Sequence, residues 1–109
     1  MVTPLDVLKK SLDHIKEPEN FCQGCLARTA RGIPVPYNHP KAVKFCALGI
    51  TLRMQGNDEA AGLMARLAIN KALEHPSLSI VNDGADGHRR IVEGFQKAIA
   101  SLEKKRRKK

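Results

Sequence analysis

Two of the three cysteines, Cys22 and Cys25, are separated by two residues, a spacing at which two thiolates can bind one zinc ion. Cys46 and His39 could complete a tetrahedral set of ligands. Structural zinc sites usually combine two such closely spaced pairs, however, and this sequence has one. Cys46 also lies in the most apolar segment of the chain, where a free thiol normally packs as a small hydrophobic group. We therefore expect buried, reduced cysteines that bind no metal, and no cofactor.

A nucleophilic cysteine is the alternative chemistry, with Cys22 as its centre. Such an enzyme needs a base, usually histidine, that meets the thiol in space, and Asp83 could orient that base. The four histidines lie in unrelated segments, and no pattern assigns one of them to Cys22. A redox-active pair would follow a strand of a thioredoxin-like sheet, which the sequence does not predict. We expect a protein that is not an enzyme and keep the Cys22 enzyme as an alternative.

The segment Asn82-Asp83-Gly84 is typical of a turn that leads into a helix. Its second interpretation is a contact with a polar or anionic ligand. The N–H groups at the start of a helix attract anions, and basic residues follow closely, namely His88, Arg89 and Arg90. Turn formation is the interpretation that we favour.

The C-terminus carries a run of six basic residues: Lys104, Lys105, Arg106, Arg107, Lys108 and Lys109. Like charges repel one another, so the sequence predicts a helical domain over residues 1–103 and a disordered tail over residues 104–109. Such a tail can strengthen weak, non-specific contact with phosphate backbones. It lacks the aromatic residues that stack on bases.

The net charge of the 109-residue chain is +8, from 19 Lys and Arg against 11 Asp and Glu. Without the six C-terminal residues, 13 basic residues remain and the net charge is +2, whereas nucleic-acid-binding domains usually carry a basic patch on the fold. No apolar run approaches the ~20 residues of a membrane span, and the N-terminus lacks the pattern of a secretory signal. Together with an odd number of cysteines, this predicts a cytoplasmic protein with reduced thiols.

The elements that would position these side chains are predicted to be helical. Thr3 is a suitable N-cap, Pro4 suits the first helical position, and apolar residues at helical spacing continue this helix to Ile15. Residues 20–28 are predicted to form a short helix or turn that Asn20 caps.

Residues 29–40 contain three prolines and a glycine, which predicts a long, extended loop. Residues 41–55 are apolar around most of a helical circumference, so we expect a central, buried helix that ends at Gly56.

Asn57 or Asp58 is expected to cap the next helix, which ends near His75-Pro76. The residues expected on its inner face are Leu63, Met64, Leu67, Ala68 and Ala72. A short apolar stretch over residues 77–81 precedes the final helix, which begins near Gly87.

No segment alternates apolar and polar residues over more than four positions, as a half-buried strand would. We predict an all-α fold, a compact single-domain bundle of four main helices plus one short helix, with a Pro/Gly-rich loop.

Three segments carry a family resemblance. They are Phe21-Cys22-Gln23-Gly24 followed by Arg28, Ala42 to Gly49 (A-V-K-F-C-A-L-G), and Val81-Asn82-Asp83 before the last helix. In order and spacing the chain resembles, from about residue 20 to residue 100, a family of small bacterial and phage proteins classed as a domain of unknown function. The family pattern reads W-C-Q-G, an A-R step, a Gly/Pro loop, A-V-x-[WF]-C-A-L-G and W-N-D. Phe21 and Val81 stand where the family has Trp, and Cys25 where it has a small residue.

The resemblance implies a small helical domain and no activity. It points to a shared pocket, or to a buried polar network, made by the small and polar residues that match. The candidate binding residues are Cys22, Gln23, Gly24, Arg28, Cys46, Asn82 and Asp83. Among them Arg28 and Asp83 would be the natural charged pair, since a guanidinium matches a carboxylate.

We therefore predict a non-enzymatic binding module for a protein partner or a small polar or anionic ligand. The family's occurrence in phages suggests an inhibitor that sequesters a host factor. The alternative is a nucleic-acid-associated accessory protein that uses the basic tail. The sequence leaves open whether the chain forms homo-oligomers.

Overall fold

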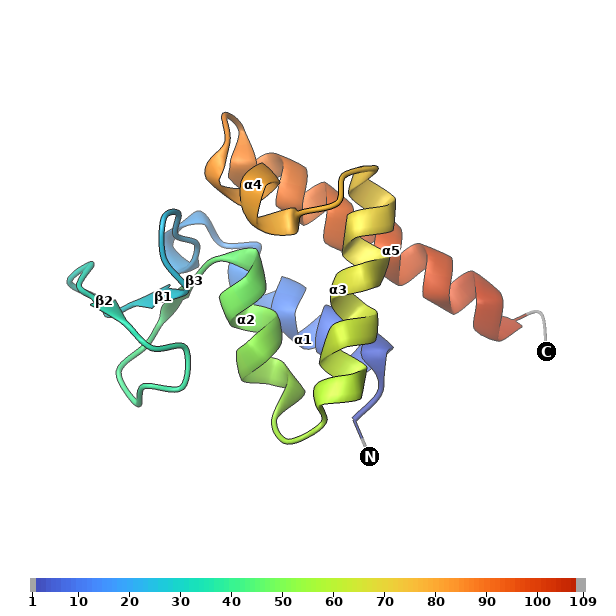
Figure 1. Ribbon diagram of the computed structural model, residues 1–109, viewed down its shortest axis with the longest axis horizontal. Coiled ribbons are helices and arrows are strands. Elements are labelled where there is room, and N and C mark those ends of the chain that lie inside the picture. Colours follow the sequence, from blue (N-terminus) through green and yellow to red (C-terminus); the bar gives the residue numbers. More distant parts are fainter. Residues whose placement is uncertain (1, 108–109) are drawn as a thin grey trace.

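Within residues 2–107, which the computed structural model describes, the chain forms five α-helices and three short strands (Figure 1). The helices are α1 (Pro4–Ile15), α2 (Ala47–Gln55), α3 (Glu59–Leu73), α4 (Leu78–Asp83) and α5 (Gly87–Arg107), and a 3-10 helix, η1 (Pro18–Asn20), follows α1. The strands are β1 (Ala27–Arg28), β2 (Pro34–Val35) and β3 (Lys44–Phe45). Of the described residues, 62% are helical, which confirms the predicted all-α class with four longer helices, although the one short helix lies elsewhere than predicted.

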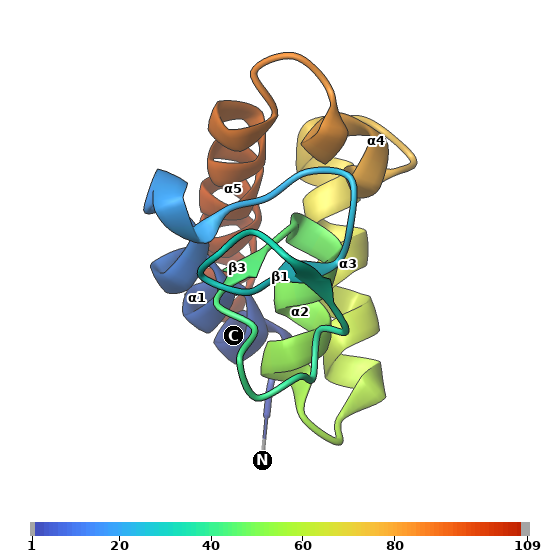
Figure 2. The same cartoon turned by 90° about the vertical axis from the view of Figure 1, so that its left-hand side faces the viewer.

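The four longer helices pack around one hydrophobic core, and α4 lies against α5 (Figures 1 and 2). Each of the four contributes side chains that are completely buried, among them Leu8, Ile50, Ile69 and Phe95. Removal of these apolar groups from water is the main force that holds the helices together. No helix within residues 2–107 is long and apolar enough to cross a membrane.

The first helix begins and ends where the sequence predicts. The hydroxyl of Thr3 accepts a hydrogen bond from the N–H of Asp6, and the carboxylate of Asp6 accepts one from the N–H of Thr3, both at 3.1 Å. This reciprocal capping box satisfies N–H groups that have no partner within the helix.

The predicted short helix over residues 20–28 does not form. Its place is taken by η1, a loop and β1. Asn20 caps no following helix, since its side-chain amide donates to the carbonyl oxygen of His14 at 2.9 Å and so closes the end of α1.

The predicted helix over residues 41–55 begins only at Ala47, because the residues before it pair with β1. The N–H of Val43 donates to the carbonyl oxygen of Arg28 at 3.0 Å, and the N–H of Cys46 donates to that of Leu26 at 3.2 Å. β1 is the central strand of a small antiparallel sheet with the order β2-β1-β3. The sheet lies at the end of the bundle opposite the C-terminal end of α5 (Figure 1).

The inner face of α3 is only partly the one predicted: Ala68 and Ala72 are half-buried against the core as expected, but the three larger residues are not. Its buried residues are mostly small, namely Ala61, Gly62, Ala65 and Ile69. Leu63, Met64 and Leu67, which the sequence placed inside, are 53%, 56% and 52% exposed. Small side chains let neighbouring helices approach closely. A Cβ on Gly62 would lie 1.7 Å from Oε1 of Gln55 in α2. Close packing of α2 and α3 therefore turns the larger side chains outward.

The short helix of the fold is α4, which Ser77 caps by accepting a hydrogen bond from the N–H of Ile80 at 3.4 Å. Asn82 and Asp83 thus form its last turn, where the sequence predicts a turn before the final helix. The last helix, α5, begins at Gly87 as expected and continues to Arg107. Four residues of the predicted disordered tail are therefore helical, and Lys108 and Lys109 lie outside the described residues.

Candidate functional site

Asn82 is completely buried and joins three parts of the chain. Its Oδ1 accepts a hydrogen bond from the N–H of Ala47, the first residue of α2, at 2.8 Å. Its Nδ2 donates to the carbonyl oxygen of Cys22 at 3.1 Å and to Oδ1 of Asp83 at 3.0 Å. The side chain therefore supplies a partner to an N–H group that has none within its own helix.

The loop that begins at Cys22 is fastened to the same turn of α4. Nε2 of Gln23 donates to the carbonyl oxygens of Asn82 at 2.8 Å and of Gly84 at 3.2 Å. The N–H of Gly24 donates to Oδ1 of Asp83 at 3.0 Å, from a backbone with φ of 82° that favours glycine. Five of the sequence-predicted site residues, Cys22, Gln23, Gly24, Asn82 and Asp83, thus lie together.

Arg28 does not form the predicted pair with Asp83. Its guanidinium donates to the carbonyl oxygens of Gly32 at 2.9 Å and of Gln23 at 3.2 Å. The carboxylate of Asp83 is bound by N–H groups of Gly24 and Asn82 instead. Arg28 therefore holds the loop beside β1, where the sequence predicted a charged contact across the central helix.

The thiols of Cys22 and Cys46 are buried and not disulfide-bonded. Burial, reinforced by the neighbouring thiols of Cys25 and Cys46, raises the pKa of Cys22 to about 12. Burial also raises the pKa of Cys46, although the N–H of Gly49 donates to its sulfur at 3.2 Å. Since the thiolate is the reactive form, these raised pKa values disfavour the alternative of an enzyme centred on Cys22.

Each of the four histidines forms a hydrogen bond with a backbone group. Nε2 of His14 lies 2.8 Å from the carbonyl oxygen of Val43, and Nε2 of His88 lies 2.8 Å from that of Ile15. Nδ1 of His39 and Nδ1 of His75 each accept a backbone N–H two residues further on. Among residues 2–107, no three His, Cys, Asp or Glu residues are grouped so that they could hold a metal ion.

A small cleft of about 180 Å³ opens beside the network. Its lining residues are Gly24, Cys25, Leu26, Cys46, Ser79, Asn82 and Asp83. Four of the predicted binding residues line this cleft, whereas Cys22, Gln23 and Arg28 do not. The polar groups of the network mostly bond to one another and to the backbone, so their clearest role is to hold the loop over residues 22–24 against α2 and α4.

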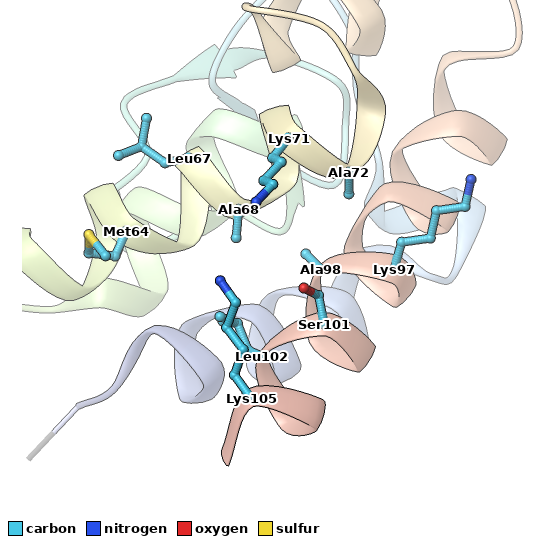
Figure 3. Close-up of a pocket in the computed structure, with 10 residues that line it drawn as sticks. All are labelled: Met64, Leu67, Ala68, Lys71, Ala72, Lys97, Ala98, Ser101, Leu102 and Lys105. Atoms are coloured by element: carbon cyan, nitrogen blue, oxygen red, sulfur yellow. The ribbon is translucent and has the colours of Figure 1, made fainter. Parts of the chain in front are cut away.

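A larger groove of about 410 Å³, which the sequence did not predict, lies between α3 and α5 (Figure 3). Its lining residues are Met64, Leu67, Ala68, Lys71, Ala72, Lys97, Ala98, Ser101, Leu102 and Lys105. The sequence does contain a signal for this groove, because α3 has two apolar faces, one of small and one of large side chains. The sequence pattern assigned the large side chains to the interior and therefore predicted no apolar groove on the surface of α3.

One residue of the C-terminal basic run, Lys105, lines this groove. Lys104 and Lys105 are exposed at the end of α5. Arg106 and Arg107 complete the helix.

Comparisons with protein-family models, with curated proteins and with solved structures find no significant match for this chain.

Proposed function

We propose that the protein is a non-catalytic binding module that captures a protein partner in the groove between α3 and α5. The observation that carries the proposal is the exposure of Met64 and Leu67, two large apolar side chains that line the groove and are each more than half exposed on α3. Contiguous exposed apolar surface is uncommon on soluble proteins unless it serves an interaction.

The groove favours a protein over a small polar ligand. Apart from its lysines, its residues carry aliphatic or small side chains, with one hydroxyl from Ser101. Burial of a half-exposed leucine or methionine against a partner contributes about 1 kcal/mol, and several such side chains can anchor an interface. The smaller cleft at Asp83 is the place for a polar ligand, but its hydrogen-bonding groups already have partners within the chain.

We propose further that the module sequesters a host factor, as an inhibitor of phage type would. The reduced cysteines support a cytoplasmic location. Sequestration of a host factor and a cytoplasmic location are therefore parts of the proposed function.

The proposal is tested by placing a photo-crosslinking amino acid at Leu67, with Ile80 as the matched control. Ile80 is 65% exposed on α4 and lies outside the groove. We expect a protein adduct at position 67 and none at position 80. The adduct is identified by mass spectrometry, and the partner is purified.

The affinity of that purified partner is then measured against the parent chain, Leu67→Glu and Ile80→Glu. A charge in the groove should weaken binding about tenfold or more, as for an interface hot spot, while Ile80→Glu binds like the parent. An adduct of two copies of this chain would indicate self-association instead. Equal binding by Leu67→Glu and the parent would refute the proposal.

A further inference from the structure

We propose that the segment held in this groove is a short, acidic, amphipathic helix of the partner. This inference rests on the proposed function and names the chemistry of its partner. It follows from the shape of the groove and from the charges at its rim.

The groove between α3 and α5 is shaped so that a third helix can pack into it. The lining residues of α3 recur at positions 64, 67, 68, 71 and 72, and those of α5 at positions 97, 98, 101, 102 and 105. Each set covers a little over two helical turns, or about 12 Å at 1.5 Å per residue. Small side chains from Ala68, Ala72 and Ala98 form the floor between two ridges, which is the surface into which the apolar stripe of a helix packs.

The rim of the groove is positively charged. Lys71, Lys97 and Lys105 line it, and none of its ten lining residues is Asp or Glu. The side chains of Lys71 and Lys105 point toward each other across the groove, whereas that of Lys97 points away (Figure 3). Two ammonium groups that converge over an apolar floor fit a partner that presents carboxylates beside its apolar stripe.

Two carboxylates of α5 near the groove are engaged elsewhere, and Glu74, at the end of α3, shares a smaller pocket with Lys97 outside the groove. Glu103 on α5 pairs with Lys9 at 3.1 Å, and Glu93 pairs with Arg89 at 3.0 Å. Neither residue lines the groove. No carboxylate of the groove lining balances Lys71 and Lys105, so a partner can supply carboxylates to these two lysines.

Other occupants fit less well. A second copy of the chain, related by a two-fold axis, would place lysines of one rim near lysines of the other and repel. A nucleic acid would satisfy the lysines through its phosphates but leave Met64, Leu67 and Leu102 without apolar contacts.

The test uses three fluorescent synthetic peptides of about 18 residues, or five helical turns. The first carries leucines at helical spacing and glutamates elsewhere. The second replaces every glutamate by lysine, and the third scrambles the first so that the leucine stripe is lost. Fluorescence anisotropy against the full chain at physiological salt should give saturable binding of the first peptide and at least about tenfold weaker binding of the other two.

Charge reversal supplies the second arm. Lys71→Glu and Lys105→Glu together should weaken binding of the acidic peptide at least about tenfold and improve binding of the basic peptide. Lys10→Glu, at an exposed position on α1 outside the groove, is the matched control and should bind like the parent. Circular dichroism of each variant verifies that the fold is retained.

Equal binding of the acidic and scrambled peptides would overturn the inference, since charge alone would then suffice. So would equal binding of the acidic and basic peptides, or displacement of the acidic peptide by a DNA oligonucleotide at equal concentration. If no peptide binds while Leu67 still crosslinks to a partner protein, the acidic helix is wrong and the binding module stands. If neither experiment gives binding, both proposals fail.

Discussion

At the scale of single residues, Asn82 contributes most to the arrangement of the chain. Its amide bonds to the backbones of α2 and of the loop at Cys22 and to the side chain of Asp83. A buried amide with both ends satisfied stabilises the fold modestly. Its removal is costly, because it leaves an N–H and a carbonyl group buried without partners.

We predict that Asn82→Ala lowers the free energy of unfolding by about 2–4 kcal/mol. Asn82→Asp should be comparably harmful, since it places a carboxylate oxygen opposite the carbonyl oxygen of Cys22 and the carboxylate of Asp83. Urea unfolding followed by circular dichroism measures both effects. Asn57→Ala, at an exposed position, is the control and should change the free energy by less than about 0.5 kcal/mol.

The thiol of Cys22 makes stability depend on pH. Its pKa is about 12 in the folded chain against an ordinary value of 9.0. Between these two values the unfolded chain releases the proton and the folded chain keeps it, so this contribution to stability is present below pH 9 and is lost as pH rises toward 12. We predict that Cys22→Ala flattens the decline of stability over this alkaline range. A decline of equal slope in the variant, measured by denaturant unfolding at several pH values, would contradict the assignment.

At the scale of elements, several caps, helix ends and the buried stripe of α1 could be predicted, whereas the interior face of α3 could not. Thr3 and Gly56 set helix limits through local chemistry, which the sequence displays directly. The strands could not be found because each has two residues and depends on partners elsewhere, as when Ala27 pairs with both Val35 and Phe45. In α3 the periodicity was right for a helix, but close packing with α2 selected its small side chains for the interior.

The candidate site, too, has parts that the sequence predicts and parts that depend on tertiary packing. Cys22 and Asn82 were predicted to converge because they belong to motifs matched in order and spacing, and they do lie together. The predicted pairing of Arg28 with Asp83 was wrong. Arg28 binds loop carbonyl oxygens instead, and the tertiary structure determines where these oxygens lie. The groove depends on which face of α3 turns inward, so sequence periodicity could not locate it.

We predict opposite outcomes for two substitutions on α3. Ala65 is completely buried against neighbouring helices, so Ala65→Leu should overpack the core and cost about 1–3 kcal/mol. Leu67→Ala, on the exposed face, should change the free energy of unfolding by less than about 0.5 kcal/mol. Thermal and urea unfolding of the two variants measure this contrast. If Leu67→Ala were the more harmful change, the face of α3 that we describe as exposed would be buried.

At the scale of the whole molecule, the polar network and the apolar groove lie in different regions. The network fastens the loop over residues 22–24 to α2 and α4, while the groove follows α3 and the C-terminal half of α5 (Figures 1 and 3). Substitutions in one region can therefore be made with little disturbance of the other, because distant sites act additively.

Deletion of residues 104–109 should leave the thermal midpoint within ~4 °C of the parent, since Lys104 and Lys105 are exposed. Any affinity for DNA should fall sharply in the truncated chain and should weaken steeply with salt in the parent. Acidic-peptide affinity should also fall, because Lys105 lines the groove. If the truncated chain bound DNA as tightly as the parent at physiological salt, the charge responsible would lie on residues 1–103.

The hydrogen bond between Asn82 and Cys22 spans 60 residues of sequence, which has a consequence for how the protein emerges from the ribosome. At about 5–20 residues per second, roughly 3–12 s separate the synthesis of the two residues. During that interval the loop and strands between α1 and α2 can pair with one another and with α1, but they lack their anchor in α4. Until α4 has left the exit tunnel, the loop at Cys22 therefore has no partner for its carbonyl group, and chaperones or proteases can reach it.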